Sequence, residues 1–575
     1  MTIDTALNDG APAGAQSIAE AFLALLKAKG VDFLFINSGT DSAPLAEAYA
    51  RQPMSGLAFP APVIGTHENL VVGMAHGYTM VTGRMQAAMV HVSVGAANAA
   101  CAVMNARRDE IPMLFIAGRT PLYEHGPLGA RSGAIHWAQE MYDQGGMLRE
   151  LVKWDYELRG GINVDEVLDR ALTIAAALPA GPVYLTLPRE VLAAPLEAPS
   201  GATRMPTIPA AAAPDPASIA RLAAMIAAAA CPILVTSASG RDPATVAPLA
   251  ALCARFGIGI VEAKSRYVCA PADHPLHLGQ DVHRWLDAAD LLLCVESEVP
   301  WLPGTAEPRD ATAVVHAGPD PLFRDYPVRS FRSDLSITTS TANLLPALAA
   351  ALAHATTDDD CARRRATLLA LAERRTRRRA ERLAPLLAAP RMTKDWMTHC
   401  LATTLPDDVI VVNEYWVDRE LYPAQRAGSF FMHSPAAGLG WGLPAAIGAA
   451  MAAPGQPVVC TTGDGAYLFC NPAACHQAAA MHEAPFLTII CNNARWGAVE
   501  TSTIGLYPAG HAARGPRPSP LSDLSPVPDF ERYVDASGGH AERVEDPLAL
   551  SDAIRRALYI VRTERRQVVL NVLCA

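Results

Sequence analysis

The sequence predicts an α/β protein with three doubly wound domains, each a parallel β-sheet covered by helices on both faces. Short apolar segments alternate with longer segments of helical periodicity along the whole chain of 575 residues. A strand that is buried on both faces is apolar at every position, whereas a strand with one wet face alternates. Hydrophobic residues make up 51% of the chain and charged residues 18%, which is enough apolar material for several cores.

The predicted elements fall into three regions with the same alternation. The first region holds helices at 17–29, 70–82, 98–107 and 164–178 and strands at 32–36, 87–92, 112–117 and 183–187. The second holds a helix at 244–256 and strands at 232–235, 259–261, 291–295 and 313–316. The third holds helices at 443–451, 473–481 and 548–560 and strands at 409–412, 457–460, 486–491 and 567–573. We therefore predict an N-terminal domain at 1–195, a middle domain at 205–355, a linker helix at 356–389 and a C-terminal domain at 390–575.

Composition and charge exclude several classes of protein. Lys and Arg number 47 against 57 Asp and Glu, so the net charge of −10 predicts no overall basic surface for nucleic acid. Twelve cysteines without a Cys-x-x-Cys pair argue against a disulfide scaffold and a structural zinc site. Residues 1–14 lack a basic start followed by an apolar run, which predicts no secretory signal. We therefore expect a cytoplasmic enzyme.

Two segments permit a second interpretation. Residues 427–463 contain no charged side chain, yet their repeated Gly and Pro fit the buried centre of an α/β domain better than a membrane span. Residues 361–387 are rich in Arg, and a nucleic-acid-binding arm is the alternative to an amphipathic linker helix. The acidic balance of the whole chain favours the linker helix. We expect neither a membrane nor a nucleic acid as a partner.

Polar residues follow two neighbouring strands of the third region. Just after the strand at 457–460 come Gly463, Asp464, Gly465 and Ala466. Asn493 follows the strand at 486–491. The glycines allow close approach of a phosphate, while the Asp and Asn oxygens and the carbonyl of Arg495 are hard ligands that suit Mg²⁺. A Gly-Asp-Gly triplet alone is more often a turn, but its place beside Asn493 at successive strand ends favours a metal-diphosphate site.

This pattern resembles the signature of thiamine diphosphate enzymes of the acetolactate synthase and benzoylformate decarboxylase type. Residues 437–446 resemble the segment under the thiazolium ring of the cofactor, where Leu439 takes the place of the bulky residue that supports the bent cofactor. A dinucleotide fingerprint in this segment fails, because Leu443 stands where the third glycine belongs. The resemblance implies that Mg²⁺ is bound and that the cofactor also contacts Asn413, Glu414 and Ala437.

The same resemblance implies two catalytic residues in the first region. Glu68 matches the glutamate that hydrogen-bonds N1′ of the aminopyrimidine, although a carboxylate stabilised by a helix N-terminus is the plainer interpretation. His91 precedes a Gly-rich turn at the place where benzoylformate decarboxylase has a catalytic histidine, so we expect proton transfer there. A core histidine is the alternative. Further pocket residues that the resemblance implies are Thr40, His67, His136, Gln139, Trp496 and Glu500. Residues 507–528 could form a lid.

The resemblance implies an enzyme that acts on a 2-oxo acid by decarboxylation, by carboligation with an aldehyde or ketone acceptor, or by both, through an enamine on the cofactor. His91 and Leu439 favour decarboxylation. An acetolactate synthase-like carboligase, a C–C lyase or hydrolase of an acyloin or diketone, and a catalytically silent binding protein stay open. The Gly-x-His-Gly turn of flavin-binding members is missing after Leu278-Gly279, so we expect no tight FAD binding. We expect a homodimer or homotetramer with active sites between subunits.

Overall fold

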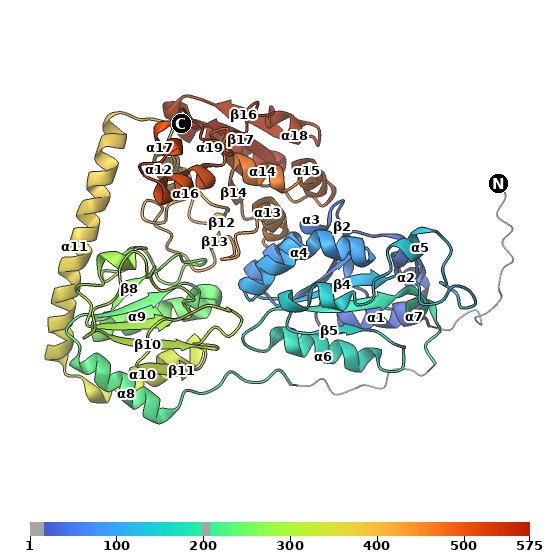
Figure 1. Cartoon of the computed structure of the whole chain (residues 1–575), viewed down its shortest axis with the longest axis horizontal. Coiled ribbons are helices and arrows are strands. Elements are labelled where there is room, and N and C mark those ends of the chain that lie inside the picture. The colour runs from blue at the N-terminus through green and yellow to red at the C-terminus, as the bar shows by residue number, and fades with distance from the viewer. Residues whose placement is uncertain (1–15, 198–206, 575) are drawn as a thin grey trace. The chain divides into compact units, whose positions relative to one another are not determined.

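Three parallel β-sheets organise the chain in a computed structural model that describes residues 16–197 and 207–574 (Figure 1). The strands of all three sheets pair in parallel, which confirms the predicted fold class. The chain divides into two compact units: the first sheet with residues 435–438, and the second and third sheets together. The domain boundaries drawn from the sequence stay a prediction. The stretch on which the absence of a secretory signal was predicted lies outside the described residues.

The first sheet has the strand order β2-β1-β3-β4-β6-β5. Its strands are β1 (Phe33–Ile36), β2 (Ala61–Ile64), β3 (Gln86–Val90), β4 (Met113–Arg119), β5 (Asp155–Glu157) and β6 (Pro182–Pro188). Its helices are α1 (Ile18–Ala28), α2 (Ala43–Ser55), α3 (Glu68–Thr82), α4 (Val92–Arg108), α5 (Ile135–Ala138), α6 (Val164–Ala176) and α7 (Arg189–Ala193). The core on one face forms between the strands and α1 and α6, while α3 and α4 pack on β3 and β4.

Helix α4 begins earlier than the sequence predicted. The expected Gly-rich turn at 91–97 is instead the first part of this helix, and His91 is its N-cap residue. Val92 takes a φ of +28°, so the chain turns from β3 straight into α4. Val and Gly are poor helix formers, which is why sequence alone placed the start at Asn98.

The third sheet repeats the strand order of the first, as β13-β12-β14-β15-β17-β16. Its strands are β12 (Ile410–Asn413), β13 (Phe430–Met432), β14 (Val458–Gly463), β15 (Leu487–Asn492), β16 (His540–Val544) and β17 (Val568–Leu573). Its helices are α12 (Lys394–Thr404), α13 (Gly442–Ala452), α14 (Asp464–Phe469), α15 (Pro472–Met481), α16 (Gly497–Leu506), α17 (His511–Arg514), α18 (Glu531–Asp535) and α19 (Leu550–Tyr559). In both sheets the strand order reverses between the strands that come first and third in the sequence. Open α/β sheets bind ligands at this point.

The second sheet belongs to the middle of the chain and has the order β11-β10-β9-β7-β8. Its strands are β7 (Pro232–Thr236), β8 (Gly259–Val261), β9 (Leu291–Val295), β10 (Ala313–Gly318) and β11 (Leu335–Thr338). Helices α8 (Pro216–Ala228), α9 (Val246–Phe256) and α10 (Thr341–Ala355) bury their apolar sides against one face. Among the residues the structure describes, no helix combines the length and the apolar character that a membrane span requires.

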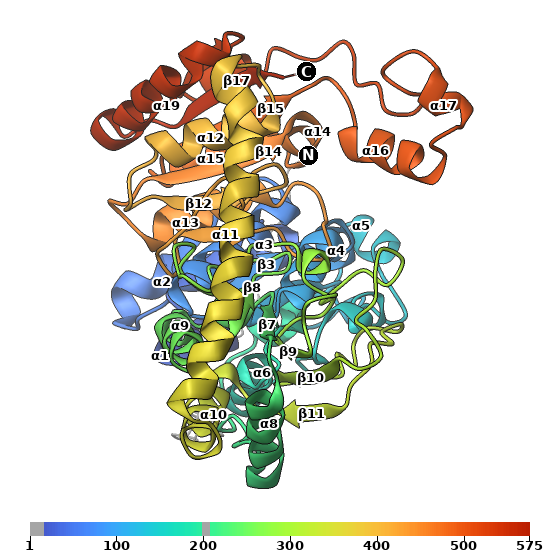
Figure 2. The same cartoon turned by 90° about the vertical axis from the view of Figure 1, so that its left-hand side faces the viewer.

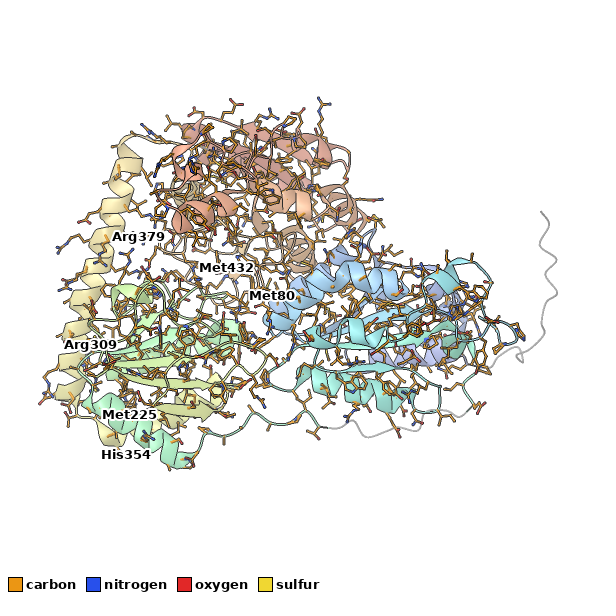
Figure 3. The ribbon with its side chains drawn as sticks, in the orientation of Figure 1. Met80, Met225, Arg309, His354, Arg379 and Met432 are labelled. Carbon is orange, nitrogen blue, oxygen red and sulfur yellow. The ribbon has the colours of Figure 1, made fainter. Side chains whose placement is uncertain are left out.

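The Arg-rich segment forms α11 (Asp358–Ala388), a helix of 31 residues that runs along the second and third sheets (Figure 2). Its arginines contact the protein itself. Buried Arg364 donates to the carbonyl of Phe256, and Arg375 pairs with Glu420 at 3.0 Å. Arg379, which lies on the same helix (Figure 3), donates a hydrogen bond to the backbone carbonyl of Leu421. These contacts use the positive charges to hold the two sheets together.

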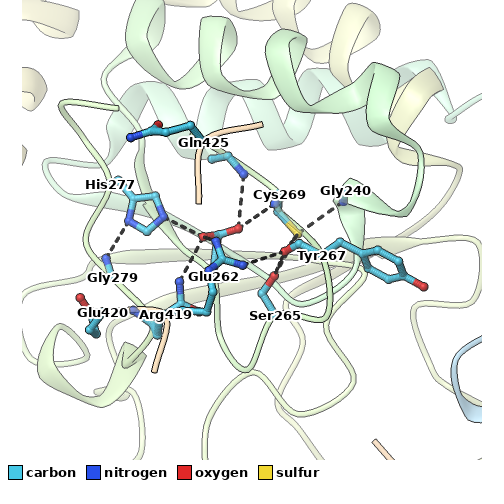
Figure 4. Close-up of polar contacts among 12 residues, drawn as sticks. Gly240, Glu262, Ser265, Tyr267, Cys269, His277, Gly279, Arg419, Glu420 and Gln425 are labelled. Carbon is cyan, nitrogen blue, oxygen red and sulfur yellow. Dashed lines mark hydrogen bonds and ion pairs between the residues drawn. The ribbon is translucent and has the colours of Figure 1, made fainter. Parts of the chain in front are cut away.

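A fully buried glutamate joins the second sheet to the segment between β12 and β13 (Figure 4). Glu262 accepts hydrogen bonds from Arg419 at 2.9 Å, His277 at 3.0 Å and the backbone N–H of Cys269 at 2.7 Å. Burial by itself raises a carboxyl pKa, but the charge of Arg419 and the hydrogen bond from His277 lower the pKa of Glu262 to about 2. The segment that Arg419 anchors begins at the edge of the site described next.

Candidate active site

The loops after β14 and β15 bring Asp464 and Asn493 together, as the sequence analysis expected. The two strands are neighbours, with Gly463 paired to Cys491 in the register. The Asp464 carboxylate accepts the backbone N–H of Gly465 at 2.8 Å on one oxygen and that of Asn493 at 3.1 Å on the other. The carboxylate is thereby fixed at the N-terminus of α14, where the helix dipole favours a negative charge.

The donor set around Asp464 fits a divalent cation. The half-buried side chain of Asn493 makes no hydrogen bond within the described part of the chain, so its amide oxygen is available as a ligand. The carbonyl of Arg495 accepts the N–H of Gly497 at 2.9 Å and keeps a second lone pair. A carboxylate, an amide oxygen and a carbonyl are the hard ligands that Mg²⁺ prefers.

These residues line an open cavity of ≈ 560 Å³, counted with its space open to solvent. The expected residues that line it are Leu439, Gly463, Asp464, Gly465, Ala466, Asn493, Arg495 and Trp496. A side-chain carbon at Gly465 would overlap the ring of Trp496, so this glycine lets the indole lie against the loop. The sequence analysis missed Lys394, whose Nζ lies 5.5 Å from the ring centroid of Tyr415 in the same cavity wall. Lys394 starts a helix far from any recognised motif, and no sequence signal marks it.

Two residues expected to touch the cofactor, Asn413 and Glu414, hold the loops beside the cavity. Neither Asn413 nor Glu414 lines the cavity. The side-chain oxygen of Asn413 accepts from Thr461 at 2.8 Å. The carboxylate of Glu414 accepts the backbone N–H groups of three consecutive residues, Gly440, Trp441 and Gly442, at 2.7, 3.0 and 3.0 Å. Burial raises the pKa of Glu414 to about 7 against the lowering effect of these three donors. Ala437, with a φ of +51°, lies in the short segment grouped with the first unit.

Glu500 contacts the segment after α16 and is not among the residues that line the cavity. Its carboxylate pairs with Arg495 at 3.2 Å and with Arg517 at 2.8 Å, and it also accepts the N–H of Ser519 at 3.3 Å. The hydrogen bond from Arg517 lowers the pKa of Glu500. Residues 507–528, expected as a possible lid, are therefore attached through Glu500 and also through backbone hydrogen bonds from Trp496 to Ser522 at 2.7 Å and from Leu524 to Ala494 at 2.9 Å.

The first unit carries the other expected residues at the carboxyl ends of its strands. Glu68 is the first residue of α3, and its carboxylate accepts a hydrogen bond from Asn98 at 2.6 Å. His67 is the N-cap of the same helix, because its Nδ1 accepts the N–H of Asn69 at 3.2 Å. The position of His67 thus fits a structural role at the helix start, while the carboxylate of Glu68 is oriented by a second side chain.

His91 lies at the end of β3 and is held by a residue that the sequence analysis did not single out. Nδ1 of His91 is 2.5 Å from a carboxylate oxygen of Asp41, which is buried. This hydrogen bond raises the pKa of His91 against the lowering effect of burial, and the negative charge of Glu68 raises it further. The pairing was hidden because Asp41 follows β1, fifty residues away along the chain.

The remaining expected pocket residues cluster loosely around His91. The side chain of Gln139 lies close to His91 and favours its protonated imidazole. The backbone carbonyl of Gln139 accepts a hydrogen bond from the Ser93 hydroxyl at 2.7 Å. His136 is buried, and burial together with nearby arginines lowers its pKa. Thr40 is exposed at the start of the short 3₁₀ helix η1 (Thr40–Ser42).

A larger hollow between α9 and α10 of the middle domain contains none of the expected residues. It has a volume of ≈ 840 Å³ with its open space, and its wall is almost entirely apolar apart from Asp242, Thr245 and Arg255. The convergent polar groups that a catalytic site requires are found instead at the strand ends described above.

Comparisons with known proteins place these residues in a family context. Residues 16–147 match the model "Thiamine pyrophosphate enzyme, N-terminal TPP binding domain", and residues 412–572 match the corresponding C-terminal TPP binding domain. The chain is 27% identical to the benzoylformate decarboxylase of Pseudomonas aeruginosa, covering 84% of this chain and 87% of that one. It is 22% identical to the acetolactate synthase isozyme 3 large subunit of Escherichia coli, covering 88% and 86%. The solved structure of a thiamine diphosphate-dependent 4-hydroxybenzoylformate decarboxylase from Rhodococcus jostii has the same fold, with a TM-score of 0.76 and 21% identity over 97% and 99% of the two chains.

Proposed function

The chain belongs to the thiamine pyrophosphate enzyme family, and on that basis we propose that it decarboxylates a 2-oxo acid to an aldehyde. The observation that carries this proposal is His91, an ionisable ring held at a strand end and influenced by the charge of Glu68. Decarboxylation to an aldehyde requires one proton for the carbon that loses CO₂. A histidine is the side chain best suited to supply that proton near neutral pH.

The residues of the third sheet fit thiamine diphosphate and Mg²⁺. No cluster of three or more His, Cys, Asp or Glu ligands occurs in residues 16–197 and 207–574, so the ion would rely on Asp464, Asn493 and the diphosphate oxygens, as Mg²⁺ commonly does. The bare backbone at Gly463, where a side-chain carbon would meet only open space, allows the diphosphate to approach. When bound, the cofactor would supply a nucleophilic carbon that adds to the substrate ketone and a positively charged thiazolium ring that takes up the electron pair left when CO₂ departs.

Glu68 is the residue to which we assign the hydrogen bond with the pyrimidine of the cofactor. Asn98 fixes the carboxylate at 2.6 Å and so selects its orientation. Leu439, in the cavity wall, is assigned the support of the cofactor. We further propose a cytoplasmic homodimer or homotetramer in which Glu68 of one copy and Asp464 of another serve one active site. The mass of the active species, measured by light scattering at micromolar concentration, tests this assembly, and an active monomer would contradict it.

The substrate class and the fate of the product are the finer parts of the proposal. Two relatives are named benzoylformate decarboxylase and 4-hydroxybenzoylformate decarboxylase, so aromatic 2-oxo acids are the first substrates to test. The relative named acetolactate synthase makes capture by a second carbonyl compound the second candidate. The raised pKa of His91 favours protonation over capture, because the hydrogen bond with Asp41 stabilises the protonated imidazole that would donate the proton.

The deciding experiment measures CO₂ release from aliphatic and aromatic 2-oxo acids, with and without thiamine diphosphate and Mg²⁺. Products are identified, and Glu68→Gln serves as the matched variant. We expect cofactor-dependent CO₂ release with more aldehyde than acyloin, and a loss of about 10²- to 10⁴-fold in the variant. An excess of acyloin would favour carboligation. No release from any acid, with cofactor still bound, would move the assignment to C–C cleavage of an acyloin or diketone, or to a silent binding protein.

A further inference from the structure

Asp41 and His91 form a buried pair at the point where the strand order of the first sheet reverses, between β1 and β3. Asp41 lies in η1 after β1, His91 ends the neighbouring strand β3, and their side chains meet at 2.5 Å. The side chain of Asp41 is 3% exposed and that of His91 is 17% exposed. The second oxygen of Asp41 faces the backbone N–H of Val92 at 3.4 Å. The carboxylate is therefore sealed behind the histidine, and the imidazole is the only partner of the two that reaches open space.

Two glycines make room for the pair. A side-chain carbon at Gly39 would overlap the ring of His91, and one at Gly118 would overlap the carboxylate of Asp41. Gly39 precedes η1, while Gly118 lies on β4, on the far side of β3. Neither glycine has the positive φ that would itself require glycine, so space for the pair is the reason we see for glycine at both positions. The backbone of three elements is thus arranged around this contact.

We propose that Asp41 is a positioning residue that fixes the tautomer of His91, with the hydrogen of Nδ1 facing Asp41 and Nε2 left as the atom that exchanges a proton with the substrate. A neutral imidazole carries one hydrogen, and the partner of one nitrogen decides which nitrogen bears it. A carboxylate accepts only, so it holds the hydrogen on Nδ1. The catalytic part of this inference rests on the proposed function, whereas the tautomer does not.

The groups around His91 act in the same direction or are weaker. Glu68 of α3 and the side chain of Gln139 both favour the protonated ring, while burial opposes it. The charge of His91 in turn lowers the pKa of the neighbouring His136 of α5. Asp41 is the largest of these influences on the pKa of His91. Removing the charge of Asp41 therefore lowers the pKa of His91 and allows the hydrogen to move between Nδ1 and Nε2.

The test is a ¹⁵N NMR titration of the His91 ring in the full-length protein, made with Asp41→Asn. The chain offers a matched control, because buried Asp109 contacts His76 at 3.1 Å in the same unit. Asp109→Asn perturbs a buried His–Asp pair without touching His91. We expect Asp41→Asn to lower the pKa of His91 and to mix its tautomers, and Asp109→Asn to leave both unchanged. An unchanged pKa and tautomer of His91 in Asp41→Asn would overturn the inference.

A second variant keeps the test valid if Asp41→Asn does not fold. Gly118→Ala pushes the carboxylate of Asp41 away from His91 without changing the charge of the protein, so it should give the same NMR signature. Turnover then separates this inference from the proposed function. If His91→Ala leaves CO₂ release unchanged, the proposed catalytic role fails while the tautomer result stands. If His91→Ala abolishes release, Asp41→Asn should lower kcat by about 10- to 1,000-fold and shift the alkaline limb of the kcat profile to lower pH.

Discussion

Replacing Glu262 by Gln tests whether its buried ion pair holds the segment beside the cavity. Glu262 is fully buried and ionised, with Arg419 at 2.9 Å and His277 at 3.0 Å. Its pKa of about 2 lies below the ordinary value of 4.5. A depressed carboxyl pKa stabilises the folded state above the unfolded-state pKa, and this stabilisation is lost as pH falls from 4.5 towards 2. The difference corresponds to about 3 kcal/mol at pH 7.

We expect Glu262→Gln to lower the free energy of unfolding by about 3 to 5 kcal/mol at pH 7, because the variant also leaves Arg419 buried without its counter-charge. The assay is urea unfolding followed by tryptophan fluorescence, to which Trp285, buried beside the second sheet, contributes. The gap between variant and wild type should shrink by about 1 kcal/mol at pH 3.5, since Glu262 begins to take up a proton in the unfolded chain.

The control removes an exposed ion pair of the same domain. Arg324 pairs with Asp320 at 3.3 Å, and its side chain is 74% exposed. Arg324→Gln should change the free energy of unfolding by less than about 1 kcal/mol. A Glu262→Gln variant that is as stable as Arg324→Gln, or a gap that does not change with pH, would refute the assigned role of the buried pair. The same variant should bind thiamine diphosphate more weakly, because Arg419 anchors the chain just beyond Tyr415 and Trp416 of the cavity wall.

Three further predictions concern the cavity itself. Asp464→Asn should abolish tight Mg²⁺-dependent binding of thiamine diphosphate in calorimetry, and unchanged binding would contradict the assigned ligand. Gly465→Ala should displace the ring of Trp496, seen as a change in its fluorescence and at least about 10-fold weaker cofactor binding; an unchanged spectrum would argue against the contact. Glu414→Gln should weaken cofactor binding about 10-fold although Glu414 does not line the cavity, because one backbone N–H then faces an amide donor instead of an acceptor. Equal affinity would show that the loop before α13 keeps its conformation without this carboxylate.

The sequence analysis predicted the central strands well and missed the edge strands other than β8. β3, β4, β14 and β15 are apolar and buried along almost their whole length, so composition alone marks them. The edge strand β2 is largely exposed and β16 is mostly half-buried, and neither is a continuous apolar run. The residues of the site divide in the same way. Asp464 and Asn493 end neighbouring strands and could be read locally, whereas Glu500 found its partner, Arg517, only through the fold.

The repeated strand order places a buried carboxylate at the same point of two sheets, and the sequence analysis singled out only one of them, Glu414. Asp41 follows β1 and Glu414 follows β12, the corresponding first strands of the first and third sheets. Both side chains are almost fully buried and neither faces the open site: one holds His91 and the other holds three backbone N–H groups of the loop before α13. At the point where the strand order of a doubly wound sheet reverses, a crevice opens at the carboxyl ends of the strands. A buried acceptor at that point orients its surroundings in the first and third sheets, through the ring of His91 in one and through three backbone N–H groups in the other.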